Sequence, residues 1–260
     1  MTLVIQENLV PGEDVEQKLA FARAAGFDGL ELRDAARPGL AAVAGAAPTV
    51  CPELRGWVGD FDAGRRVQAI DDLRRQLDGI AALGGRGVVT PAAWGMFTRR
   101  LPPFADPPRT PEQDREVLLE GLAELGAHAE AAGVVLLLEP LNRYEDHMLN
   151  TVAQAVELIA ASGAPGVKVL ADTYHMNIEE DDLCAALRSA GGALGAVHLS
   201  DSNRHQPGTG HVPFAAILAT LREIGFEGVL SVECRLRGEP EEAVRDCGRY
   251  LRALLDGAAG

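Results

Sequence analysis

Positive charge is scarce in this sequence, and lysine is almost absent. The 260 residues include 24 lysines and arginines against 38 aspartates and glutamates, which gives a formal net charge of −14. Only Lys18 and Lys168 are lysines, so arginine supplies nearly all of the positive charge. An acidic surface repels phosphate groups, so we expect neither a nucleic acid nor an anionic membrane surface as a partner.

Cysteines and long hydrophobic runs are also few. The four cysteines form no CxxC pair and no dense framework, which predicts reduced thiols rather than disulfides. The first residues do not have the basic start and long apolar stretch of a signal peptide. No apolar run approaches the roughly 18 residues that cross a bilayer. We therefore expect a cytoplasmic protein with no membrane partner.

Short apolar runs alternate with longer amphipathic stretches along the whole chain. This alternation is typical of βα units around a parallel sheet, and several runs are apolar throughout, as in strands covered on both faces. With no linker between them, the units predict an α/β fold, a TIM (β/α)8 barrel forming a single domain over residues 1–260. The expected strands are Leu3–Gln6, Gly29–Leu32, Pro48–Cys51, Gly87–Thr90, Val134–Glu139, Val167–Asp172, Ala196–Leu199 and Val229–Glu233.

Local signals predict where several helices begin. Thr110 with Gln113, and Thr151 with Gln154, have the spacing of a capping box, in which each side chain bonds the backbone of the other. Pro240 occupies a position that suits the first turn of a final helix. These signals place helices between the strands, as a barrel requires.

The longest irregular segment, Pro91–Pro108, follows the fourth expected strand. In a barrel such a segment lies at the catalytic face, where it would act as a lid or a pocket wall. A disordered surface loop is the other interpretation of the same proline-rich composition.

Four consecutive expected strands end in residues of the kinds that bind metals. Glu139 follows an apolar run, Asp172 and Glu233 end the sixth and eighth strands, and His198 lies in the seventh. The intervals between them each match one βα unit. Because strand ends of a barrel meet at one face, we expect these four side chains to converge.

A divalent cation would explain why three carboxylates converge at one place. Burying a carboxylate costs several kcal/mol unless something compensates for it, and three together repel one another. Three carboxylates and one imidazole suit Mn²⁺, Mg²⁺ or Co²⁺ better than a metal that prefers thiolates. A single polar residue at a strand end is ordinarily solvated, but four in register favour a metal site.

Three segments of the second half have distinctive sequences. They are Leu138–Glu145 (LEPLNRYE), Ala171–Glu180 (ADTYHMNIEE) and His198–Arg204 (HLSDSNR). Together they resemble the sugar isomerase/epimerase family with a xylose-isomerase-like TIM barrel. Within it the chain is most similar to the ketose 3-epimerases, the D-tagatose and D-psicose 3-epimerase group. The resemblance is detailed over about residues 134–235 and only architectural in the first half.

This resemblance implies a role for seven residues and one cofactor. The cofactor is one divalent metal ion, with Mn²⁺ preferred and Mg²⁺ or Co²⁺ as alternatives. Family members are often dimers or tetramers, which makes a homo-oligomer an open expectation. The implied metal ligands are Glu139, Asp172, His198 and Glu233; the catalytic residues are Glu139 and Glu233; the substrate contacts are Glu145, His175 and Arg204.

We therefore predict a metal-dependent sugar isomerase or epimerase, in the first place a ketose 3-epimerase. The expected reaction is deprotonation and reprotonation through a metal-bound enediolate, with Glu139 and Glu233 on opposite faces of the sugar. Returning the proton on the other face inverts the stereocentre, whereas returning it to the neighbouring carbon gives aldose–ketose isomerisation.

Several other functions remain open at this stage. Hydroxypyruvate isomerase, inosose isomerase and 3-keto-glycoside lyase would use the same barrel. A DNA-repair enzyme of the AP-endonuclease type would need more histidines and a basic face. A non-enzymatic sugar-binding protein would not need two facing carboxylates. The first-strand segment Gln6–Asn8 and the segment with Trp94, Met96 and Phe97 depart from the epimerase pattern, so the sugar itself stays open.

The remaining candidates have simpler interpretations. His147, His205 and His211 lie in polar segments, where we expect them to be solvated. Gly208–Gly210 fits an ordinary turn better than a phosphate cradle. Lys168 lies four residues before a strand end, too deep to form a Schiff base at the mouth of the barrel.

Overall fold

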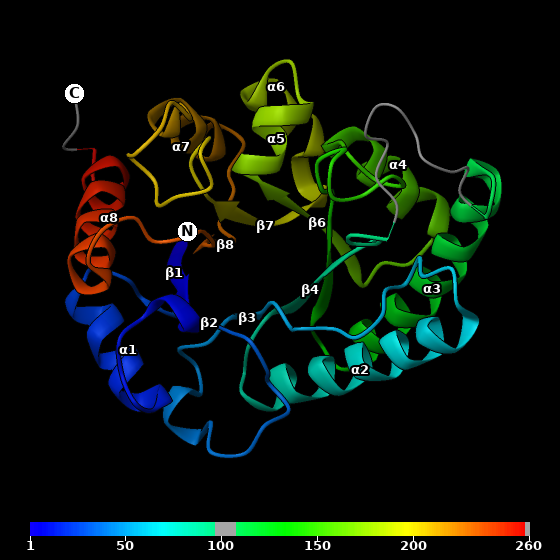
Figure 1. Cartoon of the computed structure of the whole chain (residues 1–260), viewed down its shortest axis with the longest axis horizontal. Coiled ribbons are helices and arrows are strands. Elements are labelled where there is room, and N and C mark those ends of the chain that lie inside the picture. Colours follow the sequence, from blue (N-terminus) through cyan, green and yellow to red (C-terminus); the bar gives the residue numbers. More distant parts are fainter. Residues whose placement is uncertain (97–107, 258–260) are drawn as a thin grey trace.

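The protein is a closed barrel of eight parallel strands in sequence order, with β8 pairing back onto β1 (Figure 1). The computed structural model describes residues 1–96 and 108–257. This confirms the predicted TIM barrel. The strands are β1 Thr2–Gln6, β2 Gly29–Leu32, β3 Thr49–Val50, β4 Gly87–Pro91, β5 Val135–Glu139, β6 Val167–Asp172, β7 Leu194–Leu199 and β8 Val229–Val232.

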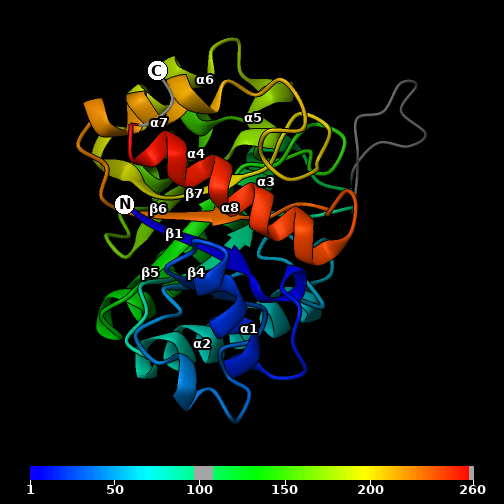
Figure 2. The ribbon, with the colours of Figure 1, turned by 90° about the vertical axis from the view of Figure 1, so that its left-hand side faces the viewer.

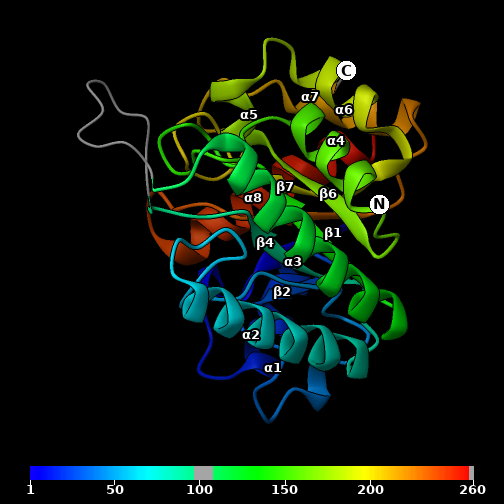
Figure 3. The same cartoon turned by 90° about the vertical axis from the view of Figure 1, so that its right-hand side faces the viewer.

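Helices form the outer layer of the barrel. Figure 2 shows α1 and α8 on one side, and Figure 3 shows α2, α3 and α4 on the opposite side. The α-helices are α1 Val15–Ala24, α2 Ala63–Ala82, α3 Pro111–Ala131, α4 Val152–Ser162, α5 Thr173–Glu179, α6 Leu183–Ala190, α7 Phe214–Glu223 and α8 Pro240–Leu255. Short 3-10 helices cover Glu7–Leu9, Ala41–Val43 and Gly191–Ala193.

The expected helix between every pair of strands is missing at one place. Residues 33–48, all described by the structure, join β2 to β3 with only the 3-10 turn Ala41–Val43. Two helices, α5 and α6, instead follow β6. The segment between β2 and β3 is rich in alanine, glycine and proline, and so has too few large apolar residues for an amphipathic helix.

Two separate apolar layers hold the barrel together. The larger layer lies between the outer face of the strands and the helices. The smaller layer fills the barrel interior and consists of one residue each from six strands: Val4, Val89, Leu137, Leu170, Ala196 and Val229. Since side chains alternate along a strand, the residues two positions further on also face the interior. In β5, β6 and β7 those residues are polar, and they form the site described below.

Most expected boundaries agree with the structure. Thr110 and Thr151 each form a complete capping box, with Gln113 and Gln154 respectively. The third strand is shorter than expected, because only Thr49–Val50 pairs with its neighbours. The eighth strand ends at Val232, so Glu233 follows the strand rather than ending it.

The remaining expectations concern the cysteines, Lys168, the segment Pro91–Pro108 and membrane-spanning helices. All four cysteines are free. Lys168 donates from Nζ to the carbonyl of Gly192, which lies just before the start of β7. Lys168 is therefore at the amino-terminal end of the barrel, away from the carboxyl ends of the strands. Part of the segment Pro91–Pro108, expected as a lid, lies outside the described residues. No helix within residues 1–96 and 108–257 is both long and apolar enough to span a bilayer.

Candidate metal centre and active site

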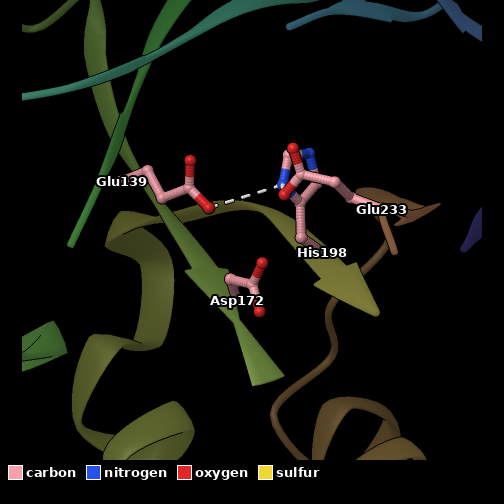
Figure 4. A group of neighbouring side chains, drawn as sticks. All are labelled: Glu139, Asp172, His198 and Glu233. Carbon is pink, nitrogen blue, oxygen red and sulfur yellow. Dashed lines mark hydrogen bonds and ion pairs between the residues drawn. The ribbon is translucent and has the colours of Figure 1, made fainter. Parts of the chain in front are cut away.

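The structure brings the four expected metal ligands together at the strand ends (Figure 4). Glu139, Asp172, His198 and Glu233 each offer one ligand atom, and these atoms all lie within 4.8 Å of one another. The first three follow the interior apolar residues Leu137, Leu170 and Ala196 by two positions, so strand alternation points them into the barrel. The convergence that the sequence predicted is therefore present, while the roles of the residues remain predictions.

The donor set fits a divalent cation. His198 Nδ1 lies 3.1 Å from Glu233 Oε2 and 3.5 Å from Glu139 Oε1, so the imidazole and both glutamates face one point. Glu139 Oε1 is buried and accepts no hydrogen bond from any residue in the described part of the chain. A buried carboxylate oxygen without a donor is costly, and a cation would satisfy it. Three carboxylates and one imidazole suit a hard or borderline ion.

Asp172 connects the centre to the start of a helix. Its Oδ1 accepts hydrogen bonds from the backbone of Tyr174 at 2.6 Å and of His175 at 3.4 Å, so it caps helix α5. Capping by an aspartate satisfies amide groups that would otherwise lack partners. The cap fixes the carboxylate and directs its second oxygen toward the centre, where Arg204 donates to it.

Arg204 bridges two of the three carboxylates. Its guanidinium donates to Asp172 Oδ2 at 2.6 Å and to Glu233 Oε2 at 2.9 Å, and it stacks on the Tyr174 ring at 4.8 Å. The backbone of Arg204 has a φ of 60°, which costs a non-glycine residue on the order of 1 kcal/mol. The surrounding structure thus holds the side chain beside the cluster. Its role as a substrate contact stays a prediction.

Glu145 and His175 form a second polar group, joined by Asn142. The amide Nδ2 of Asn142 lies 2.9 Å from Glu145 Oε1 and 2.8 Å from His175 Nδ1. Because the backbone N–H of Asn142 also donates to His175 Nδ1, that nitrogen is the acceptor and the proton lies on Nε2. The indole of Trp94 donates to Glu145 Oε2, and 55% of this side chain is exposed. Asn142 and Trp94 are site residues that the sequence analysis did not assign.

The two glutamates of the centre differ in their affinity for a proton. Burial raises the pKa of Glu139 above its ordinary value. Burial acts on Glu233 in the same direction, but the charges of His198 and Arg204 hold its pKa well below the usual range. Glu139 therefore binds a proton more tightly than Glu233, because the charges of His198 and Arg204 together lower the pKa of Glu233.

Glu31 in β2 is a further site residue that the sequence analysis missed. It is buried and lies in register with Gln6 of β1 and Thr49 of β3. Gln6 also donates from Nε2 to Glu233 Oε1 at 3.1 Å, which connects the first strand to the eighth. The signal was available, because Glu31 is a carboxylate two positions after Gly29 inside a short apolar strand.

Two loop expectations can be compared with the structure. The backbone amides of Gly208 and Thr209 donate to the Asp201 carboxylate, so the segment Gly208–Gly210 is a turn organised around an internal anion.

The prediction of a solvated His147 is wrong. Only 3% of its side chain is exposed, and its Nε2 lies 3.1 Å from Asp114 Oδ2. Burial of a loop histidine depends on the folding of distant segments, which local composition does not show.

Asp146, next to this histidine, makes the stability of the fold depend on pH. Burial raises the pKa of Asp146 to about 7 from an ordinary value of 3.8. The folded state thus holds the proton more tightly than the unfolded state, and its stabilising effect is lost as the pH rises through about 7. At roughly 1.4 kcal/mol for each pKa unit, the loss is up to about 4 kcal/mol.

We expect the variant Asp146→Asn to lack this pH dependence. Urea unfolding between pH 4 and pH 8 should show that the wild type loses stability relative to the variant as the pH rises. The exposed Asp181→Asn serves as a control and should follow the wild type. Parallel curves for Asp146→Asn and the wild type would rule out the elevated pKa of Asp146.

Comparisons with known proteins give the family. A family model described as the xylose isomerase-like TIM barrel matches residues 19–254. The chain is 39% identical over 249 residues to 3-dehydro-D-guloside 4-epimerase of Escherichia coli (strain K12), covering 92% of this chain and 95% of that protein. It is 37% identical over 208 residues to D-psicose 3-epimerase of Enterocloster bolteae, covering 78% of this chain and 65% of that protein.

Solved structures agree with the sequence comparison. The structure of a 3-keto-D-glucoside 4-epimerase from E. coli matches with a TM-score of 0.92 at 38% identity, over 97% of this chain and 99% of that chain. An L-ribulose 3-epimerase matches with a TM-score of 0.86 at 27% identity, over 99% and 96%. The predicted carbohydrate isomerase or epimerase is thereby confirmed at this level, and the other predicted activities are not favoured. The chain belongs to the xylose isomerase-like TIM barrel family, among relatives that are sugar epimerases.

Proposed function

We propose that this enzyme inverts a stereocentre next to the ketone of a sugar, using one divalent metal ion. The observation that supports this most is the position of two glutamates on different sides of one ligand cluster. Glu139 comes from β5 and Glu233 follows β8, and both approach His198 Nδ1 within 3.5 Å. Two carboxylates on different sides of a sugar allow a proton to leave one face and return on the other.

The residues of the chain would divide the work as follows. One glutamate removes the proton next to the carbonyl, and the other supplies a proton to the opposite face. Arg204 and His175, with Glu145, hold hydroxyl groups of the sugar and fix which carbon lies between the glutamates. A bound cation supplies positive charge that stabilises the negative charge developing on the carbonyl oxygen. The roles of these five residues are part of the proposal.

Mn²⁺ is the ion we propose for this site. Oxygen donors from Glu139, Asp172 and Glu233 with one imidazole suit Mn²⁺, Mg²⁺ or Co²⁺, and the mixed donor set favours a transition metal over Mg²⁺.

We further propose that all 260 residues form one domain of a cytoplasmic enzyme that acts without nucleic acid or membrane. The oligomeric state stays open, with a homo-oligomer as the expectation from the family.

We propose a 3-keto-glycoside as the preferred substrate. The chain matches a protein named 3-dehydro-D-guloside 4-epimerase over nearly the full length of both sequences. A glycoside needs room beyond the reacting ring. A cavity of about 540 Å³ lies among the segments that follow β1, β2 and β3, at the same end of the barrel as the candidate ligands, and its lining includes Asn8, Arg33 and Glu53. Charged side chains in this lining, such as Arg33 and Glu53, can form hydrogen bonds with a hydroxylated substituent.

A free ketose is the second candidate, with epimerisation at carbon 3. Relatives named D-psicose 3-epimerase and L-ribulose 3-epimerase are 37% and 33% identical to this chain. The seven residues that the resemblance implied also match this group. These relatives cover less of the chain than the keto-glycoside enzyme does, which is why we place the free ketose second.

A substrate panel in D₂O tests both candidates. Purified enzyme with Mn²⁺ is incubated with a methyl 3-keto-glucoside, D-fructose, D-tagatose and hydroxypyruvate, and the products are followed by NMR. We expect deuterium to enter the carbon next to the ketone together with inversion, fastest for the keto-glycoside. Faster turnover of a free ketose would support the second candidate. Conversion of hydroxypyruvate alone would contradict the proposed epimerase.

A further inference from the structure

The buried carboxylate of Glu31 contacts the side of His198 that faces away from the other candidate ligands. His198 Nε2 lies 3.1 Å from Glu31 Oε2 and 3.3 Å from Glu31 Oε1. The other ring nitrogen, Nδ1, faces Glu139 and Glu233. Glu31 and His198 are almost completely inaccessible to solvent, at 1% and 0% exposure. The imidazole therefore lies between Glu31 and the centre.

The remaining contacts of Glu31 determine the direction of this hydrogen bond. Gln6 donates from its amide Nε2 to Glu31 Oε2 at 3.1 Å, and Thr49 donates from its hydroxyl to Glu31 Oε1 at 2.7 Å. An amide N–H can only donate, so the carboxylate is the acceptor of these bonds. Glu31 thus acts as the acceptor for three groups, and His198 Nε2 is the donor. With Nε2 engaged by Glu31, Nδ1 is the ring nitrogen that faces the candidate ligands and is available to a cation.

We propose that Glu31 is a positioning residue, which holds His198 in the ring orientation and tautomer that bind the metal through Nδ1. A carboxylate behind a metal-binding histidine also increases the electron density on the ring and strengthens its bond to the metal. Removal of such a partner ordinarily weakens metal affinity about 10- to 100-fold. This inference rests on the proposed metal site and adds a residue that the ligand set does not include.

Two other roles for Glu31 agree less well with the geometry. A fifth metal ligand would have to approach the centre directly, but the oxygens of Glu31 lie on the Nε2 side of the ring, and Glu31 is not among the four converging residues. A purely structural role would explain the bonds to Gln6 and Thr49. It would not explain why the third partner of the buried Glu31 carboxylate is His198, one of the four candidate metal ligands.

Metal affinity provides the first test. Isothermal titration of Mn²⁺ into the metal-stripped protein is compared for the wild type, Glu31→Gln and Glu31→Leu. We expect affinity to fall about 10- to 100-fold, with the larger loss in Glu31→Leu, because leucine cannot accept the bond from Nε2. The matched control is Glu227→Gln, in which the same change is made to an exposed carboxylate just before β8, and it should bind Mn²⁺ like the wild type.

The tautomer of His198 provides a second test that does not depend on metal or activity. Long-range ¹H–¹⁵N NMR of the metal-stripped wild type should show a proton on His198 Nε2, whether or not the carboxylates on the other side of the ring also keep Nδ1 protonated. Glu31→Leu should lose this fixed protonation of Nε2. If Glu31→Leu does not fold, Thr49→Val retains Glu31 but removes one of its donors, and it should show a smaller loss of Mn²⁺ affinity.

The outcomes separate this inference from the proposed function. Variants that fold, bind Mn²⁺ within twofold of the wild type and keep the Nε2 tautomer would overturn the role of Glu31. A wild type that binds no divalent ion would instead overturn the metal site. In that case a proton on His198 Nε2 that depends on Glu31 would still show that Glu31 orients the ring, although no metal binds there.

Discussion

Glu139→Gln and Glu233→Gln should each lower kcat for epimerisation on the order of 1000-fold, within the range ordinarily lost with a general acid or base. Glutamine has nearly the same shape as glutamate but cannot take up a proton at neutral pH. Inversion needs a carboxylate on each face of the sugar, so either replacement stops the complete reaction. The proposed substrate contacts Arg204 and His175 are retained, and an amide oxygen at position 233 can still accept the hydrogen bond from Arg204, so KM should change much less than kcat.

Hydrogen exchange with solvent should distinguish the two variants. When Glu233 is replaced, Glu139 can still remove the proton of the epimer that presents it to that face, and return a deuteron on the same side. We therefore expect each variant to exchange only one of the two epimers in D₂O, and the two variants to exchange opposite ones. NMR of each pure epimer measures this directly.

Because both glutamates are also expected metal ligands, loss of the ion must be separated from loss of a proton carrier. Asp172→Asn is the matched variant, since Asp172 is an expected ligand with no proposed proton role. Excess Mn²⁺ should restore much of its activity but little of the activity of the two glutamine variants. Exchange of both epimers by either glutamine variant would rule out the assignment of one glutamate to each face.

The sequence predicted the second half of the site because its signal is local. In β5 and β6 an apolar run leads directly into Glu139 or Asp172. The buried strand and its polar last residue are therefore adjacent in the sequence. In the first half the signal is weaker, because the carboxylate Glu31 lies inside an apolar strand rather than at its end. Glu31 is followed by an apolar residue, Leu32, within the same strand, so it does not look like a strand end. Its role becomes visible only when closure of the barrel brings β2 near β7 and β8.

Gln6 is a clearer example of a site contact that cannot be predicted from neighbouring residues in the sequence. Its Nε2 contacts Glu233, a residue 227 positions away in the sequence. In the sequence it appears only as a polar residue in a segment that departs from the epimerase pattern. In the fold, it links Glu31 to Glu233. A single polar side chain in a first strand is therefore informative only once the pairing of β1 with β8 is known.

Removal of the divalent ion should abolish activity and lower thermal stability together. Glu139, Asp172 and Glu233 place three carboxylates around one imidazole, and in the fold Arg204 is positioned to neutralise only two of them. Bound ion at about 1000 times its dissociation constant stabilises the folded state by about 4 kcal/mol. For a chain of this size, that corresponds to a rise in Tm on the order of 10 °C.

Calorimetry with and without Mn²⁺ after treatment with a chelator measures this shift. Asp172→Asn should show a much smaller rise in Tm at the same Mn²⁺ concentration, whereas Asp181→Asn, an exposed aspartate outside the cluster, should show the full rise. Equal shifts in Asp172→Asn and the wild type would place the bound ion elsewhere. Because stability reports on binding and turnover reports on chemistry, agreement between their Mn²⁺ dependences would assign both to one site. A stability shift at Mn²⁺ concentrations that leave turnover unchanged would show that the ion of the cluster is not the one that catalysis requires.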